Sequence, residues 1–113
     1  MEIRHYLEVE AREDVPGVLL RTVIGAEDDA PRFAMRVFEV NPGSSTPFHS
    51  HWWEHEVFIL SGEGVAKGQQ GETQLSEGTV VFVIPNEEHC FINSGTDILR
   101  FICVVPLTDA VET

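Results

Sequence analysis

The sequence predicts a single all-β domain, and three observations lead to this prediction. The 113 residues are enough for one hydrophobic core but not for two. The apolar runs are short, rich in Val, Ile and Phe, and bounded by Gly, Pro, Asn and Ser. No segment shows the period of about 3.6 residues that marks an amphipathic helix. Many short strands without intervening helices are typical of a sandwich or a barrel.

Turn residues divide the chain into eight expected strands. The separating segments are AEDDAPR, NPGSS, LSGEG, KGQQGE, SEG, IPNEE and NSGTD, and KGQQGE has the composition of a hairpin turn. Residues 1–16 are polar and less regular, so we expect them to add an edge strand or to form part of a dimer contact. The expected strands cover residues 18–24, 33–40, 56–60, 64–67, 74–75, 79–84, 90–93 and 99–105.

Charge and composition exclude several classes of partner. Nineteen acidic residues against seven basic ones give a net charge of −12, which repels phosphate backbones and anionic membranes. No apolar run approaches the roughly 18 residues of a membrane span, and the N-terminus lacks the apolar segment of a signal peptide. We therefore expect a cytoplasmic protein that binds neither nucleic acid nor membranes, with Cys90 and Cys103 as buried thiols.

Four of the five histidines indicate a metal site. His49 and His51 are two residues apart, so on a strand their side chains project to the same face. His55 shares that parity if the strand continues past the two tryptophans, and His89 reaches the site from a distant strand. Neutral imidazole is a common ligand of divalent transition metals. The spacing thus predicts one metal ion on these residues.

Two segments around these histidines resemble the cupin family. Residues 43–62, GSSTPFHSHWWEHEVFILSG, resemble the first cupin motif, except that His55 stands where the motif has glutamate. Glu56 fits a looser version of the same motif, which makes it the rival ligand to His55. Residues 78–93, GTVVFVIPNEEHCFIN, resemble the second motif, with Ile84 in place of its proline and Asn86 in place of its glycine. The resemblance covers residues 18–106. It implies a double-stranded β-helix, or jelly-roll barrel, formed by one domain over residues 1–113.

The sequence is especially similar to small bacterial manganese cupins that have four histidine ligands. This similarity implies one divalent ion per chain on His49, His51, His55 and His89, with manganese favoured. The ligand types alone also suit Fe, Ni, Cu or Zn. The leading functional hypothesis is a metal-dependent, dioxygenase-type oxidoreductase acting on a small organic substrate. The alternatives are a non-catalytic module that binds a small ligand through its metal and a non-redox metal-dependent isomerase.

The sequence also supports expectations for two arginines, for the oligomeric state and for the residues around the metal. Arg36 and Arg100 lie in expected strands and are predicted to face solvent. The resemblance also implies a homodimer, because small cupins often pair through edge strands. The sequence identifies no catalytic acid or base. The residues predicted to line the pocket or to contact the metal ligands are Trp52, Trp53, Glu54, Phe91, Phe101 and Cys103.

Overall fold

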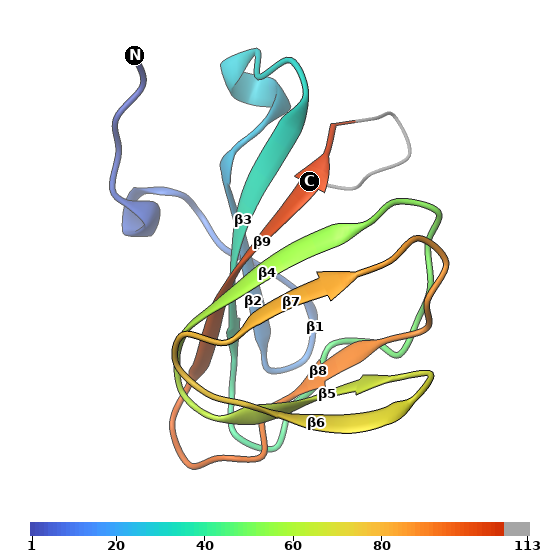
Figure 1. The fold of residues 1–113 in the computed structure, drawn as a ribbon. Helices are drawn as coiled ribbons and strands as arrows, with labels where there is room; N and C mark the ends of the chain where they lie inside the picture. The colour runs from blue at the N-terminus through green and yellow to red at the C-terminus, as the bar shows by residue number, and fades with distance from the viewer. Residues whose placement is uncertain (108–113) are drawn as a thin grey trace.

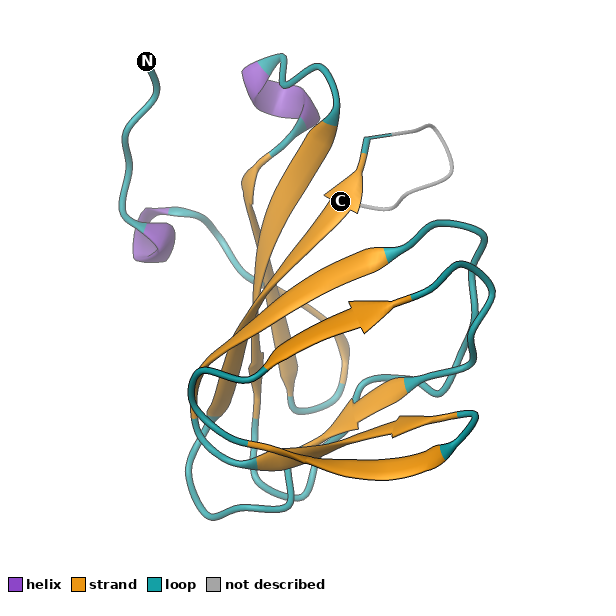
Figure 2. Ribbon diagram, viewed as in Figure 1, coloured by secondary structure: helices purple, strands orange, loops and turns teal. Residues whose placement is uncertain are grey.

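Two antiparallel sheets form the body of the molecule in the computed structural model, which describes residues 1–107 (Figures 1 and 2). The six-stranded sheet has the order β1-β2-β3-β9-β4-β7, and the three-stranded sheet has the order β6-β5-β8. The strands are β1 (Arg12–Val15), β2 (Val18–Ile24), β3 (Phe33–Val40), β4 (His55–Ser61), β5 (Gly64–Gly68), β6 (Gly71–Leu75), β7 (Val80–Val83), β8 (Cys90–Ile92) and β9 (Leu99–Pro106). This is the all-β barrel that the sequence predicts.

The core lies between the two sheets because the strands alternate buried and solvent-facing side chains. In β9 every second residue is buried, from Leu99 to Val105, and in β4 the buried positions are His55, Val57 and Ile59. A side-chain period of two places these residues on one face of the six-stranded sheet. Leu75 of β6 and Phe91 of β8 complete the same apolar cluster from the opposite sheet.

The segment before β4 extends the smaller sheet and closes one side of the barrel. Residues 43–49 run antiparallel to residues 89–93, with the Gly43 N–H donating to the Asn93 carbonyl at one end. At the other end, His49 and His89 each donate a backbone N–H to the carbonyl of the other, over 3.2 and 2.9 Å. This pairing brings together two histidines that lie 40 positions apart along the chain.

The fold explains why Gly62 and Asn93, at the ends of the two cupin-like motifs, suit their positions. Gly62 has a φ of +89°, and a Cβ atom at this position would lie 2.4 Å from the Ile98 carbonyl oxygen. A larger residue would therefore be both strained and obstructed. The buried Asn93 amide donates to the carbonyls of Val40 and Asp97 over 2.7 and 2.8 Å, which ties β8 to β3 and to the turn before β9.

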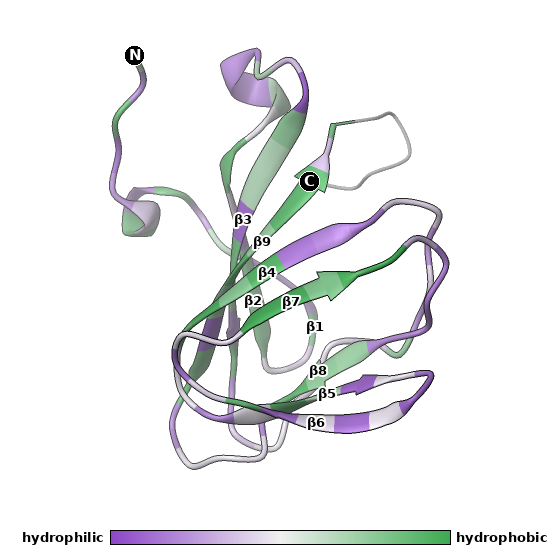
Figure 3. Cartoon of the chain, in the orientation of Figure 1, coloured by the Kyte–Doolittle hydropathy of each residue, from purple (hydrophilic) through white to green (hydrophobic). Residues whose placement is uncertain are grey.

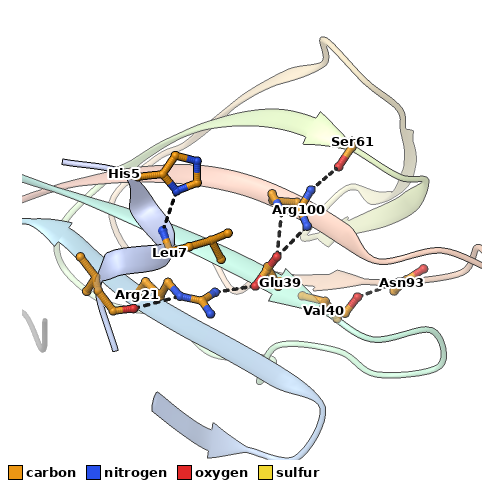
Figure 4. A network of polar contacts seen from close by, with 9 residues as sticks. His5, Leu7, Arg21, Glu39, Val40, Ser61, Asn93 and Arg100 are labelled. Atoms are coloured by element: carbon orange, nitrogen blue, oxygen red, sulfur yellow. Dashed lines mark hydrogen bonds and ion pairs between the residues drawn. The ribbon is translucent and has the colours of Figure 1, made fainter. Parts of the chain in front are cut away.

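The N-terminal segment packs across the outer face of the six-stranded sheet. Arg4 donates to the Val23 carbonyl over 2.7 Å, and Arg21 donates to the Val9 carbonyl over 3.1 Å. Figure 4 shows the neighbouring network in which Arg21 and Arg100 both contact Glu39. Burial alone raises the pKa of Glu39, but the hydrogen bonds from Arg100 and Arg21 outweigh it, so that pKa lies below its ordinary value.

The observed elements differ from the expected ones mainly where the sequence is polar. β1 forms at the sheet edge, within residues 1–16, where an edge strand is one of the two expectations. By contrast, 3-10 helices occupy Tyr6–Glu8 and Ala26–Asp28, where irregular structure or a turn is expected. Arg36 is buried, so its predicted exposure is wrong. Within residues 1–107 no helix is long and apolar enough to cross a membrane.

Truncating a buried isoleucine should lower the free energy of unfolding far more than truncating an exposed one. Ile59 is fully buried, whereas Ile84 is 49% exposed. We expect Ile59→Ala to lower the free energy of unfolding by about 2–5 kcal/mol because it leaves a cavity. Ile84→Ala should lower it by less than about 1 kcal/mol. Urea denaturation of both variants checks this, and equal losses would contradict the packing described.

Candidate metal centre

Three histidines lie where they can hold a metal ion together. His49, His51 and His89 each bring one ring nitrogen to within 4.8 Å of the other two. His49 and His89 come from the paired segments at the end of the smaller sheet, and His51 follows two residues after His49. Solvent exposure decreases across the three side chains: His49 is exposed, His51 is half-buried and His89 is buried. The group therefore faces the solvent on one side and the barrel interior on the other.

Backbone carbonyls orient two of these rings. The Nδ1 atom of His51 lies 2.7 Å from the Trp53 carbonyl oxygen, and that of His89 lies 2.7 Å from the Glu87 carbonyl oxygen. A carbonyl only accepts hydrogen bonds, so each Nδ1 atom must carry the proton. The Nε2 atom of each neutral ring then keeps its lone pair, which is the form that binds a metal.

His55 lies beside this group at the start of β4. Its Nε2 atom is 2.5 Å from the Nε2 atom of His51, and the His55 and His89 ring centroids are 5.3 Å apart. Two lone pairs that face each other at this distance repel unless a proton or a cation lies between them. The structure thus brings together all four histidines that the sequence predicts as ligands.

Burial favours the neutral forms of His49, His51 and His55. Burial, followed by the nearby Arg36 cation, lowers the pKa of His55 from 6.5 to about 2. Burial is also the main cause of the lowered pKa values of His49 and His51. Neutral imidazoles are ready to bind a cation without first losing a proton.

Arg36 and Cys103 contact the Nδ1 side of the His55 ring. The Nη2 atom of Arg36 lies 3.4 Å from His55 Nδ1 and 3.3 Å from the Cys103 sulfur, and that sulfur is 2.7 Å from His55 Nδ1. Burial is the first cause of the raised pKa of the Cys103 thiol. The sequence did not identify Arg36 as a residue of the site. Arg36 is two residues from Ala34 and from Phe38, so all three side chains project to the same, inward face of β3.

A cavity of about 340 Å³ opens onto the histidines, and its walls are largely apolar. Phe38 and Phe101 stack with ring centroids 5.0 Å apart, and Trp53 stacks on His51 at 4.3 Å. Arg36 supplies positive charge within this wall. The lining residues are Asp14, Val15, Val18, Leu20, Arg36, Phe38, Thr46, Pro47, His49, Ser50, His51, Trp53, His55, His89, Phe91, Phe101 and Cys103.

The structure places Trp52 and Glu54 away from this cavity, whereas Trp53, Phe91, Phe101 and Cys103 line it. Trp52 is 53% exposed and Glu54 is also exposed, in the bend that precedes β4. Glu56, the rival ligand, is exposed on the outer face of β4.

Comparison with known proteins agrees with this architecture. The cupin domain family matches residues 36–105, more than half of the chain. The chain is a member of the cupin family. The polyketide cyclase RemF from Streptomyces resistomycificus is 34% identical, with a TM-score of 0.86 over 94% of this chain and 79% of that one. A predicted oxalate decarboxylase from Thermotoga maritima is 26% identical, with a TM-score of 0.81 over 95% and 100% of the two chains.

A curated relative matches over a shorter stretch of this cupin. The oxalate-binding protein from Thermotoga maritima is 37% identical over 67 residues, which are 58% of this chain and 55% of that protein. The cupin thus spans about half the length of this relative, and the match establishes no shared ligand.

The lowered pKa of His55 should make the metal-free cupin less stable as the pH falls. Unfolded His55 takes up a proton near pH 6.5, whereas the folded form stays neutral until about pH 2. Stability is therefore lost below pH 6.5 at about 1.4 kcal/mol per pH unit for this one residue. His55→Gln should flatten the fall between pH 6.5 and 5, whereas His5→Gln in the exposed N-terminal segment should not. Urea denaturation across this range measures both slopes, and equal slopes would refute the assignment.

Proposed function

We propose that this cupin is a metal-dependent enzyme acting on a small organic compound that has an apolar body and metal-binding oxygen atoms. The observation that supports this proposal most strongly is the position of the histidine group on the wall of an apolar cavity. Concave, mostly apolar sites with a few polar groups are typical of small-molecule binding. The positive charge of Arg36 in the same wall favours a substrate with an anionic oxygen.

The residues fit a divalent transition metal, with His55 as the fourth ligand beside His49, His51 and His89. Their neutral nitrogens suit such an ion, and the Nδ1 contacts of His51 and His89 direct the Nε2 atoms away from the backbone. Manganese is proposed from the resemblance to four-histidine cupins. When bound, the ion polarises a coordinated oxygen as a Lewis acid, and a redox-active metal also permits oxygen chemistry. The four imidazoles leave its charge uncompensated.

The first candidate reaction is the dioxygenase-type oxidation predicted from the sequence. The apolar walls would hold the body of the substrate and exclude water, while Arg36 would orient an anionic group. Among the described residues that line the cavity, Asp14 is the only acid, so a carboxylate base beside the histidines is not part of the proposal.

Two observations favour other functions. The similarity to RemF, named as a polyketide cyclase, favours non-oxidative chemistry in which the metal acts only as a Lewis acid. The similarity to an oxalate-binding protein favours a module that binds an anionic ligand without changing it. Oxygen dependence and turnover separate these functions from the first.

Metal loading and oxygen uptake test the proposal together. We expect about one divalent ion per chain by elemental analysis, lost in His51→Ala and reduced in His55→Ala, but kept in Glu56→Ala, since that side chain points outward. Oxygen uptake with a panel of catechols and enols should require Mn or Fe. Metal-dependent turnover without oxygen would favour the cyclase-like reaction, and binding without turnover would favour the module. Metal-independent turnover would overturn the proposal.

We also infer that the cupin forms a homodimer through the outer face of β4 and β7. Phe58, Val80 and Phe82 are 45%, 70% and 61% exposed there, and Phe33 of β3 is 64% exposed on the same sheet. Figure 3 shows β7 in the colour of hydrophobic residues. At about 200 Å² for each ring, the three phenylalanines leave roughly 350 Å² of apolar surface uncovered. A standard interface buries about 800 Å² per partner, somewhat more than half of it apolar, so this face supplies most of what a second copy needs.

A charge placed on this face should separate the two copies. Light scattering should give a dimeric mass for the wild type and a monomeric mass for Phe82→Lys, since the contact would then bury an unpaired cation. Leu7→Lys, in the exposed N-terminal segment, is the matched control and should remain dimeric. A monomeric wild type would contradict the inference, and a monomeric Leu7→Lys with a dimeric Phe82→Lys would assign the contact to the N-terminal segment.

A further inference from the structure

Trp53 contacts His51 through both its backbone and its side chain. Its carbonyl oxygen lies 2.7 Å from the His51 Nδ1 atom. Its indole lies parallel to the imidazole, with ring centroids 4.3 Å apart and an angle of 4° between the ring planes. The hydrogen bond sets which edge of the imidazole faces the backbone, and the stack sets the plane in which the ring lies. Together the two contacts determine where the Nε2 atom of His51 points.

The parallel stack differs from the ring contacts among the histidines themselves. The imidazoles of His51 and His55 meet at 65°, and those of His49 and His89 meet at 72°. In such edge-to-face contacts the positive edge of one ring meets the negative face of the other. Trp53 instead presents the face of its indole to the face of the His51 ring, so the charge on that ring decides how strongly the two attract.

The surroundings of the indole hold it in this orientation. Trp53 packs against the apolar core, and Trp52 meets its ring at 86° with centroids 5.6 Å apart. The Nε1 atom of Trp53 is buried and has no hydrogen-bond partner among residues 1–107. Packing, rather than a hydrogen bond from the indole N–H, therefore fixes the ring. A side chain that is already fixed loses little conformational entropy when its contact with His51 becomes stronger.

Metal binding would make the stacked imidazole positive. A cation bound at Nε2 draws electron density from the ring, and a bound cation is often the largest charge in its surroundings. The face of an indole attracts positive charge through its quadrupole, more strongly than the rings of tyrosine and phenylalanine do. His51 is half-buried, so water screens this attraction only in part. The stack should thus be stronger in the metal-bound chain than in the metal-free one.

We propose that Trp53 is a positioning residue for His51, and that its indole face stabilises the ring of His51 in the metal-bound form. The carbonyl contact belongs to the backbone, so substitution of the Trp53 side chain isolates the contribution of the stack. The inference deepens the proposed function and rests on it for the metal, whereas the stack itself is a property of the metal-free chain.

A purely structural role for Trp53 makes a different prediction. If the indole only filled space beside His51, its effect on metal affinity would depend on its size and not on the charge of its face. Fluorination of the indole separates the two roles, because each fluorine withdraws electron density from the ring face and changes the ring volume little.

Proton spectra of the metal-free protein test the stack. The carbon-bound ring protons of His51 should be shifted upfield by the ring current of the indole, and Trp53→Leu should remove this shift. Trp52→Phe is the matched control and should keep it, since Trp52 is 53% exposed. Unshifted His51 protons in the wild type would overturn the inference.

Co²⁺ titration tests the effect of the indole face. Trp52→Phe serves as the reference because it leaves Trp53 as the only tryptophan. Adding Trp53→Leu should weaken Co²⁺ binding by roughly 3–30-fold, as expected for loss of a partly shielded cation–π interaction. Trp53→Phe should restore part of the affinity.

The fluorinated series decides between the two roles. Tryptophans with one, two and three ring fluorines, incorporated into Trp52→Phe, should weaken Co²⁺ binding stepwise without lowering the free energy of unfolding of the metal-free protein. Equal Co²⁺ affinity across the series would overturn the proposal, and the series still decides should Trp53→Leu fail to fold. A chain that shows shifted His51 protons but binds no metal would refute the proposed function, and with it the stabilising role of Trp53, while the stack itself would stand.

Discussion

The arrangement of the site depends on the contacts that His51, His55 and His89 make through their Nδ1 atoms. An imidazole has two nitrogens, and a neutral ring can direct only one lone pair at a metal. In this cupin the backbone carbonyls of Trp53 and Glu87 take the Nδ1 protons of His51 and His89. Each carbonyl lies within two residues of the histidine that it orients, so local chain geometry fixes both rings. His55 faces a side chain instead, and its orientation depends on distant strands.

Strand pairing supplies the second constraint on the site. The antiparallel pairing of residues 43–49 with residues 89–93 places His49 opposite His89. β4 lies between β9 and β7, which turns His55 toward the interior beside Cys103. A shift of one residue in either register would point these side chains to the opposite face. The same packing that forms the core therefore also sets the positions of the four histidines, and burial is the main cause of the lowered pKa values of His49, His51 and His55.

Much of this molecule could be predicted from its sequence because its signals are local. The bounds of β2 and β3 match the expected ranges, and strand parity together with the two motifs identified the four histidines that the fold brings together. Other features depend on partners that no local pattern encodes. An edge strand was expected within residues 1–16, but the bounds of the polar strand β1 follow from its pairing with β2. Arg36 is buried on the inward face of β3, opposite Cys103 of β9. In the run FAMRVFEV both faces are largely apolar, so parity alone could not show which side faced the core.

The central claim is that the imidazole nitrogens of this cupin converge on one ion. X-ray absorption spectroscopy at the edge of the metal loaded into the protein tests this most directly, because imidazole rings give a characteristic outer-shell scattering that carboxylates and water lack. The account predicts a first shell of nitrogen and oxygen at about 2.0–2.2 Å, with the outer-shell signal of four imidazoles. A spectrum with oxygen ligands and no imidazole scattering would contradict it.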